Sequence, residues 1–315
     1  MKAGLQIACT VFALICATTP LQAQSFSVED LARRTIERRG IEAVIWGIPA
    51  VNTDLMRQQM LTKTGGKVGQ VIYWGRPLDS KNQTLTPNPD ALYFMTFFDT
   101  KGGPMVLDLP PGDANGSFNG NMVTVWQMPL EDGGLLGVDQ GKGGKFLILP
   151  PGYKDKAPDG YYTLRSDTFG GYMLFRANFK SHSDADVQAA IAYGKRMKVY
   201  PLSQAANPPP TVFVDVKDDD FDSTIRYDAS FFENLSRIVQ EEPWIDRDRA
   251  MIDQLKSLGI EKVQSGRGHE SAVDSRGAGS RRMTGGEIRR GASAVLLGEE
   301  PLELPGTARG HQIVH

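Results

Sequence analysis

The sequence predicts an α+β protein built around a mainly antiparallel, jelly-roll-like β-sandwich with helices before and after it. Three observations support this fold class. The 315 residues are 40% apolar, 9% aromatic and 23% charged, which is the balance of a soluble globular protein. Short runs rich in Val, Ile, Phe and Tyr begin near residue 70. The segments that flank them carry apolar residues at helical spacing.

The first 23 residues have the layout of a secretory signal peptide. Lys2 gives a positive start, an apolar run follows from Ile7 to Ala17, and the small Ala23 precedes the expected cleavage point. The apolar run is too short for a membrane anchor, which needs roughly 20 residues. Lipid modification of Cys16 is the other alternative. We expect export to the periplasm or beyond, and no membrane span in the mature chain.

Cysteine content and charge exclude several classes of function. Cys9 and Cys16 both lie inside the signal-like segment, so the mature chain has no disulfide, thiol nucleophile or thiolate metal site. The net charge of −2 gives no overall attraction for nucleic acid or an anionic membrane. We expect neither partner, and the sequence leaves homo-oligomer formation open.

The globular region opens with two predicted helices. Ser27 is placed to cap the first, whose apolar face comprises Val28, Leu31, Ala32, Thr35 and Ile36. Arg33 and Arg34 follow Glu29 and Asp30 at a spacing of four, which favours an ion-paired, solvated face for the arginines of this segment. The second helix is expected from about Glu42 to Leu61, with a bend at Pro49 because proline lacks an amide hydrogen.

Eight strands follow, with few helices between them. This spacing favours an antiparallel sandwich or barrel over a parallel sheet. The expected strands are Gln70–Trp74, Leu92–Phe98, Pro104–Leu109, Asn121–Met128, Lys145–Leu149, Tyr161–Arg165, Tyr172–Phe179 and Thr211–Val216.

Helices return near and after the end of the sheet. One begins at Asp184 and ends with the cations Lys195, Arg196 and Lys198, which suit a helix C-terminus better than a phosphate site. Another opens with a capping box at Ser230–Glu233. A last helix starts at Asp246 and ends at Gly259.

Composition changes sharply after Gln264. Residues 265–315 contain no Phe, Tyr, Trp or Lys, which argues against a packed core. The predicted organisation is therefore a signal peptide at 1–23, one β-rich domain at 24–264, and a disordered or non-native tail at 265–315.

The order of motifs resembles a known bacterial family. The motifs are Thr86-Pro87-Asn88-Pro89-Asp90-Ala91-Leu92-Tyr93, Gly103-Pro104-Met105-Val106-Leu107-Asp108-Leu109-Pro110, Leu149-Pro150-Pro151-Gly152-Tyr153 and Pro158-Asp159-Gly160. Together they resemble domain-of-unknown-function family 1254, over roughly residues 41–262. Members of that family commonly continue into a second domain, numbered 1214, and here the change in composition stands in its place. The resemblance implies the organisation and export, and it implies no reaction.

Few catalytic mechanisms remain for the body of the chain. His182 is its only histidine, so a zinc site of the usual ligands is excluded. The chain has no nucleophile-elbow, phosphate-loop or dinucleotide-binding motif. The acidic run Asp218–Asp222 fails the calcium-loop register, with Ser223 where glycine is needed. We expect no metal and no cofactor.

The remaining candidate is a polar cluster at the mouth of the sandwich. Asp90 and Tyr93 are its candidate catalytic residues. Its candidate ligand-binding residues are Tyr73, Trp74, Asn88, Trp126, Arg165 and Arg176. Aromatic walls with a few polar groups are what a small-molecule site needs. The structural alternative is that Asn88 and Asp90 satisfy turn amides and that the aromatic residues are core.

Two functions stay open. The first is an exported module that binds a small, acidic ligand in an aromatic-lined pocket. The second is a hydrolase-type enzyme in which Asp90 acts as general acid or base, while Tyr93 and an arginine stabilise charge.

Overall fold

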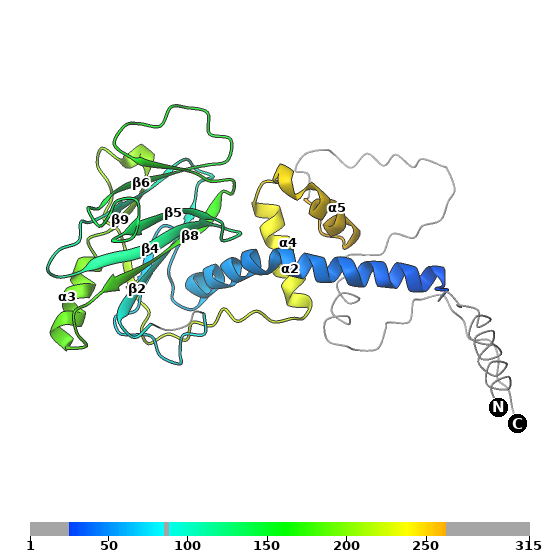
Figure 1. Ribbon diagram of the computed structural model, residues 1–315, viewed down its shortest axis with the longest axis horizontal. Coiled ribbons are helices and arrows are strands. Elements are labelled where there is room, and N and C mark those ends of the chain that lie inside the picture. Colours follow the sequence, from blue (N-terminus) through cyan, green and yellow to red (C-terminus); the bar gives the residue numbers. More distant parts are fainter. Residues whose placement is uncertain (1–24, 85–87, 263–315) are drawn as a thin grey trace, which may run out of the picture.

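The computed structural model describes residues 25–84 and 88–262, and the predicted signal peptide and tail lie outside the described residues. A β-sandwich forms one end of the described molecule and the helices α2, α4 and α5 form the other (Figure 1). The prediction of an α+β fold with two mostly antiparallel sheets is therefore confirmed.

The two sheets have six and four strands. The first has the order β10-β1-β2-β8-β4-β5 and the second β7-β6-β3-β9. Only β1/β10 and β6/β7 pair in parallel among these strands, and neither sheet closes into a barrel. The strands are β1 (Val71–Tyr73), β2 (Ala91–Asp99), β3 (Met105–Leu109), β4 (Ser117–Thr124), β5 (Pro129–Gly134), β6 (Gly144–Leu149), β7 (Tyr162–Arg165), β8 (Gly170–Asn178), β9 (Lys198–Pro201) and β10 (Phe213–Asp215).

Strand β2 lies in the middle of the first sheet, and its two faces contact two different hydrophobic cores. Its alternation sends Leu92 and Phe94 into the core between the two sheets. Tyr93, Met95 and Phe97 point to the outer face, where they pack with the end of α2. The division follows from the geometry of a strand, in which successive side chains point to opposite faces.

Helix α2 runs as one element from Val28 to Thr62, so the prediction of two helices is wrong. Ser27 caps it as expected, accepting the Asp30 amide at 3.0 Å. The helix continues past Gly40 because small residues on this face allow α4 to pack closely. A Cβ at Gly47 would lie 3.0 Å from Leu235 Cδ1, which shows how near the two helices approach.

Helices α4 (Ala229–Glu241) and α5 (Arg249–Ser257) pack on α2 in a core of their own. Asp228, and not Ser230, caps α4, because its side chain accepts the Ser230 amide at 2.8 Å. A 3-10 turn at Asp246–Asp248 precedes α5. Gly259 follows α5 with φ of 74°, a conformation that favours glycine.

Helix α3 (Asp184–Gly194) lies across one end of the sandwich (Figure 1). Ser183 caps it by accepting the Asp186 amide. The Tyr193 hydroxyl donates to the Pro110 carbonyl at 3.2 Å, and the Tyr193 ring packs on Phe118 of β4. A 3-10 turn at Leu202–Gln204 follows β9. The end of α3 is thereby fixed beside the end of β3.

Candidate functional site

The predicted turn before β2 satisfies its own amides. The Asn88 side-chain oxygen accepts the Asp90 amide at 2.8 Å, as an Asx turn does. The Asp90 carboxylate is 76% exposed and lies 3.1 Å from Nε2 of His182, which follows β8. This geometry matches the structural role considered for Asn88, and it adds His182 as a partner of Asp90.

Tyr93 and Arg176 are brought together across the β2–β8 pair. They are direct register partners, and Arg176 Nε donates to the Tyr93 hydroxyl at 3.3 Å. Tyr93 is 1% exposed. Asn119 of β4 is the next residue in the same row. Its side-chain carbonyl is buried without a hydrogen-bond partner among the described residues.

The other predicted ligand-binding residues lie apart. Tyr73 stacks on Phe94 inside the sandwich, with centroids 5.3 Å apart. Trp74 is on the outer face, edge-on to Phe221. Trp126 packs on Trp46 in the helical core. Arg165 belongs to β7 of the second sheet and donates to the Tyr153 carbonyl. None of the eight predicted site residues lines either of the two clefts that follow.

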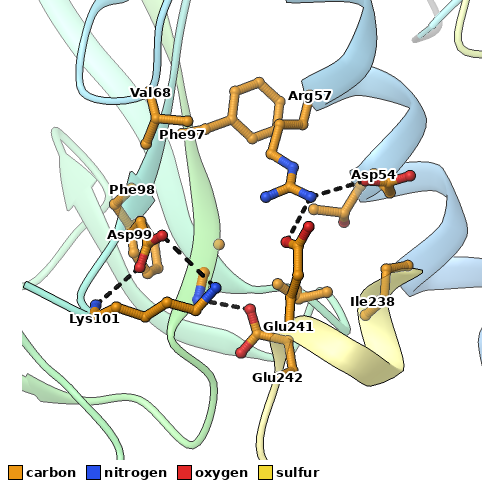
Figure 2. A pocket seen from close by; sticks show the side chains of 14 residues that line it. Asp54, Arg57, Val68, Phe97, Phe98, Asp99, Lys101, Ile238, Glu241 and Glu242 are labelled. Atoms are coloured by element: carbon orange, nitrogen blue, oxygen red, sulfur yellow. Dashed lines mark hydrogen bonds and ion pairs between the residues drawn. The ribbon is translucent and has the colours of Figure 1, made fainter. Parts of the chain in front are cut away.

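The first cleft lies where α2 and α4 meet the sandwich (Figure 2). One of its buried carboxylates is Asp54, whose side chain is 1% exposed. Asp54 pairs with Arg57 at 3.0 Å and with Arg237 of α4. Arg57 also binds Glu241 at 2.7 Å. The ion pairs therefore connect α2 with the last turns of α4.

Glu242 follows Glu241 at the end of α4 and also lines this cleft (Figure 2). It is 4% exposed, and its carboxylate accepts the Phe169 amide at 2.6 Å and the Gly170 amide at 2.9 Å. Burial raises the pKa of the Glu242 carboxyl, while the two amides act in the opposite direction. Because these charged groups bind protein partners, the first cleft is best described as the joint between the helices and the sandwich.

The second cleft is a groove on the open side of the sandwich, with a volume of about 620 Å³. It lies where the end of β3, the end of α3 and the segment before β10 come together. Its lining residues are Asp108, Leu109, Pro110, Pro111, Lys195, Arg196, Met197, Lys198, Pro208, Pro209, Pro210, Thr211 and Phe213. We call it the α3 groove.

Cations line one side of the α3 groove. Lys195 Nζ lies 4.6 Å from the centroid of the Tyr73 ring, which places a predicted residue directly behind the groove. Arg196 is held by Asp113, whereas neither Lys195 nor Lys198 forms an ion pair within the part of the chain that the structure describes. Lys198 is the register partner of Asp108 on β3. An anion placed in the groove would lie near these cations.

The sequence analysis assigned these cations to a helix end and missed the groove. The sequence nevertheless contains a signal for the groove, which is Lys195-Arg196-Met197-Lys198 followed closely by three prolines at 208–210. Over the described ranges, no group of three or more His, Cys, Asp or Glu side chains is placed to hold a metal ion. Nor does any helix within those ranges combine the length and apolar character that a bilayer span needs.

The solved structures that match the chain include the following two. The VPA0106 protein from Vibrio parahaemolyticus aligns with a TM-score of 0.55 and 14% identity, over 84% of this chain and 58% of that one. The chain thus spans less than two thirds of that protein, and at this identity the likeness concerns the fold alone. A putative uncharacterized protein from Burkholderia cenocepacia aligns with a TM-score of 0.28 and 13% identity, over 56% of this chain and 50% of that one. No curated protein matches the chain.

One protein family matches the sequence. Its description is protein of unknown function DUF1254, and the match covers residues 68–201. This range runs from β1 through β9 and includes α3, so it takes in most of the sandwich and eight of the 13 residues that line the α3 groove. The resemblance drawn from the sequence motifs is thereby confirmed, because residues 68–201 of this chain match the model of domain-of-unknown-function family 1254.

Proposed function

We propose that this protein is an exported module that binds a small acidic molecule in the α3 groove. The observation that carries the proposal is a groove of about 620 Å³ with lysines on one side and apolar residues beneath it. That volume falls within the range of roughly 300–1,000 Å³ that small-molecule sites occupy. The proposal keeps the predicted class of ligand and moves the site from the turn before β2 to the end of α3.

The α3 groove is a better candidate site than the first cleft because the charged groups of the groove include side chains that have no ion-pair partner among the described residues. In the first cleft the acidic side chains already have partners, so a ligand would have to displace those partners. In the α3 groove Lys195 contacts an aromatic face, and it has no carboxylate partner among residues 25–84 and 88–262. A bound carboxylate would gain that cation as a partner without breaking an existing ion pair.

A calorimetric titration tests this proposal. The full-length chain is titrated with a panel of small carboxylates, alongside Lys195→Ala, Lys198→Ala and the control Lys154→Ala. Lys154 is an exposed lysine of the β6–β7 loop. We expect at least one acid of the panel to bind the native chain and the control with equal affinity. The same acid should bind each groove variant about tenfold more weakly. Equal binding by all four proteins would contradict the proposal.

A second candidate is the hydrolase-type enzyme, favoured by one observation. Asp90 contacts His182 at 3.1 Å, and Tyr93 contacts Arg176 at 3.3 Å, both at the same end of the β2–β8 pair. Asp90→Asn combined with Tyr93→Phe tests this candidate in an ester hydrolysis assay. Loss of turnover with an unchanged melting temperature supports catalysis, and unchanged turnover excludes this pair from it.

Export is proposed from residues 1–23, with cleavage after Ala23. Expression of the full-length chain in a bacterium with a periplasm tests it. We expect a periplasmic product whose N-terminal sequence begins at Gln24. An intact N-terminus confined to the cytoplasmic fraction would contradict export.

A further inference from the structure

This inference rests on the proposed function and names the class of ligand. We infer that the α3 groove takes an amphipathic monocarboxylate, with its anionic head at Lys195 and Lys198 and an apolar chain over Phe213 and Leu109. The division of polar and apolar groups along the groove carries this inference.

The floor of the groove is continuous with the core of the sandwich. Leu109 and Met197 are each 2% exposed and belong to the core between the sheets. Phe213 packs partly buried against that core, with its ring 6.5 Å from the Phe94 ring. β9 and β10 are edge strands of different sheets, so the groove opens where the sandwich is not covered by a strand. Apolar ligand atoms here would extend an existing core.

The walls of the groove provide few hydrogen-bond donors. Five of its 13 lining residues are prolines, at positions 110, 111, 208, 209 and 210, and proline has no amide hydrogen. The Thr211 hydroxyl accepts the Val199 amide at 3.0 Å. A ligand with many hydroxyl groups, such as a sugar, would leave most of them unpaired here, which is costly. A hydrocarbon chain has no such requirement.

The charge pattern fits one anionic group rather than two. Arg196 is held by Asp113, which leaves Lys195 and Lys198 as the cations of the groove without an ion pair to any described residue. Asp108 lines the same groove beside Lys198. A second carboxylate on the ligand would approach Asp108 and be repelled. The groove therefore selects a single head group.

A chain-length series tests the inference. Saturated monocarboxylates from two to twelve carbons, and the matching primary alcohols, are titrated into the full-length chain below their micelle concentrations. We expect the affinity to rise about threefold for each added methylene until the groove is filled. Each alcohol should bind about tenfold more weakly than its acid. A dicarboxylate of equal length should bind more weakly than the monocarboxylate.

Variants separate the head from the chain. Lys195→Ala should weaken the acids and leave the alcohols unchanged. Phe213→Ala should remove the dependence on chain length. Phe213→Leu should restore part of the dependence on chain length. If thermal unfolding shows that Phe213→Ala does not fold, Phe213→Leu replaces it in the titrations.

The outcomes distinguish the inference from the proposed function. If short and long acids bind equally and Lys195→Ala abolishes both, the groove binds acids but the amphipathic class is wrong. If alcohols bind as tightly as acids, the head-group assignment is wrong. If no acid of the series binds, the inference is overturned, and the broader panel of carboxylates then decides whether the proposed function is overturned with it.

Discussion

The Gly170 amide donates to the Glu242 carboxylate at 2.9 Å, so the first residue of β8 is tied to the residue that follows α4. The neighbouring Phe169 amide donates to the same carboxylate at 2.6 Å. Glu242→Ala would leave both amides without this acceptor, so we expect a loss of about 2–3 kcal/mol in the free energy of unfolding. Urea denaturation measures it, with the exposed Glu42→Ala as control, expected to change stability by less than about 0.5 kcal/mol.

The same carboxylate predicts a dependence of stability on pH. Burial raises the pKa of Glu242 above the value of about 4.3 expected in the unfolded chain. Between these two pKa values the folded state binds more protons than the unfolded state. The free energy of unfolding must therefore fall as pH rises through this interval. Urea denaturation of the native chain and Glu242→Gln from pH 4 upward measures the trend, and an identical slope for the two proteins would contradict it.

Asp54 should be one of the most sensitive positions in the helical layer. Its side chain is 1% exposed and pairs with Arg57 and Arg237. Asp54→Ala removes the common acceptor of both guanidinium groups. Because Arg57 keeps Glu241 as a partner and Arg237 is 41% exposed, we expect a loss of about 1–3 kcal/mol. Asp246→Ala is the control, because its pair with Arg249 is exposed and contributes less than about 1 kcal/mol. Similar midpoints for the two variants in thermal unfolding would disprove the difference.

Gly194 of α3 lies directly against Phe94 of β2. A Cβ at this position would lie 2.1 Å from Cζ of Phe94, a ring that is 1% exposed. Gly194→Ala must therefore displace a core side chain, at a cost of about 1–3 kcal/mol. Gly102→Ala is the matched control, because nothing lies within 4 Å of its Cβ position. Chemical denaturation of both variants should show a loss for Gly194→Ala alone.

Thr96 offers a substitution that should stabilise the protein. It is 2% exposed, and its hydroxyl is buried without a hydrogen-bond partner in the described part of the chain. Thr96→Val has nearly the same shape and removes this unpaired group, so we expect a gain of about 1 kcal/mol. At Thr100 the hydroxyl donates to the Phe169 carbonyl at 2.9 Å, and Thr100→Val should lose about 1 kcal/mol. Opposite shifts in melting temperature are the expected result.

Much of the sheet could be predicted because its strands are rich in β-branched and aromatic residues. All eight expected strands overlap a strand of the structure. β5 has the sequence Pro-Leu-Glu-Asp-Gly-Gly, which has no strand propensity, and it forms because β4 pairs with it. The helix break predicted before Glu42 is absent for a similar reason. Gly40 and Gly47 lower the local helix propensity, but packing against α4 outweighs it.

The candidate site was harder to predict because it depends on register. Local sequence correctly placed Asn88 beside Asp90, since an Asx turn involves only neighbours. The contact between Tyr93 and Arg176 requires two strands to pair across 83 residues. The α3 groove requires β3, the end of α3 and the proline segment to meet, and no pattern within one segment encodes that meeting.

The pairing of β1 with β10 has a consequence for synthesis of the chain. Val71 pairs with Phe213, so the first strand made receives its outer neighbour last. Until residues 213–215 have left the ribosome, β1 is an uncovered sheet edge that can recruit other nascent chains. Proteins truncated before residue 213 should therefore precipitate during expression, although they retain every residue of the family match.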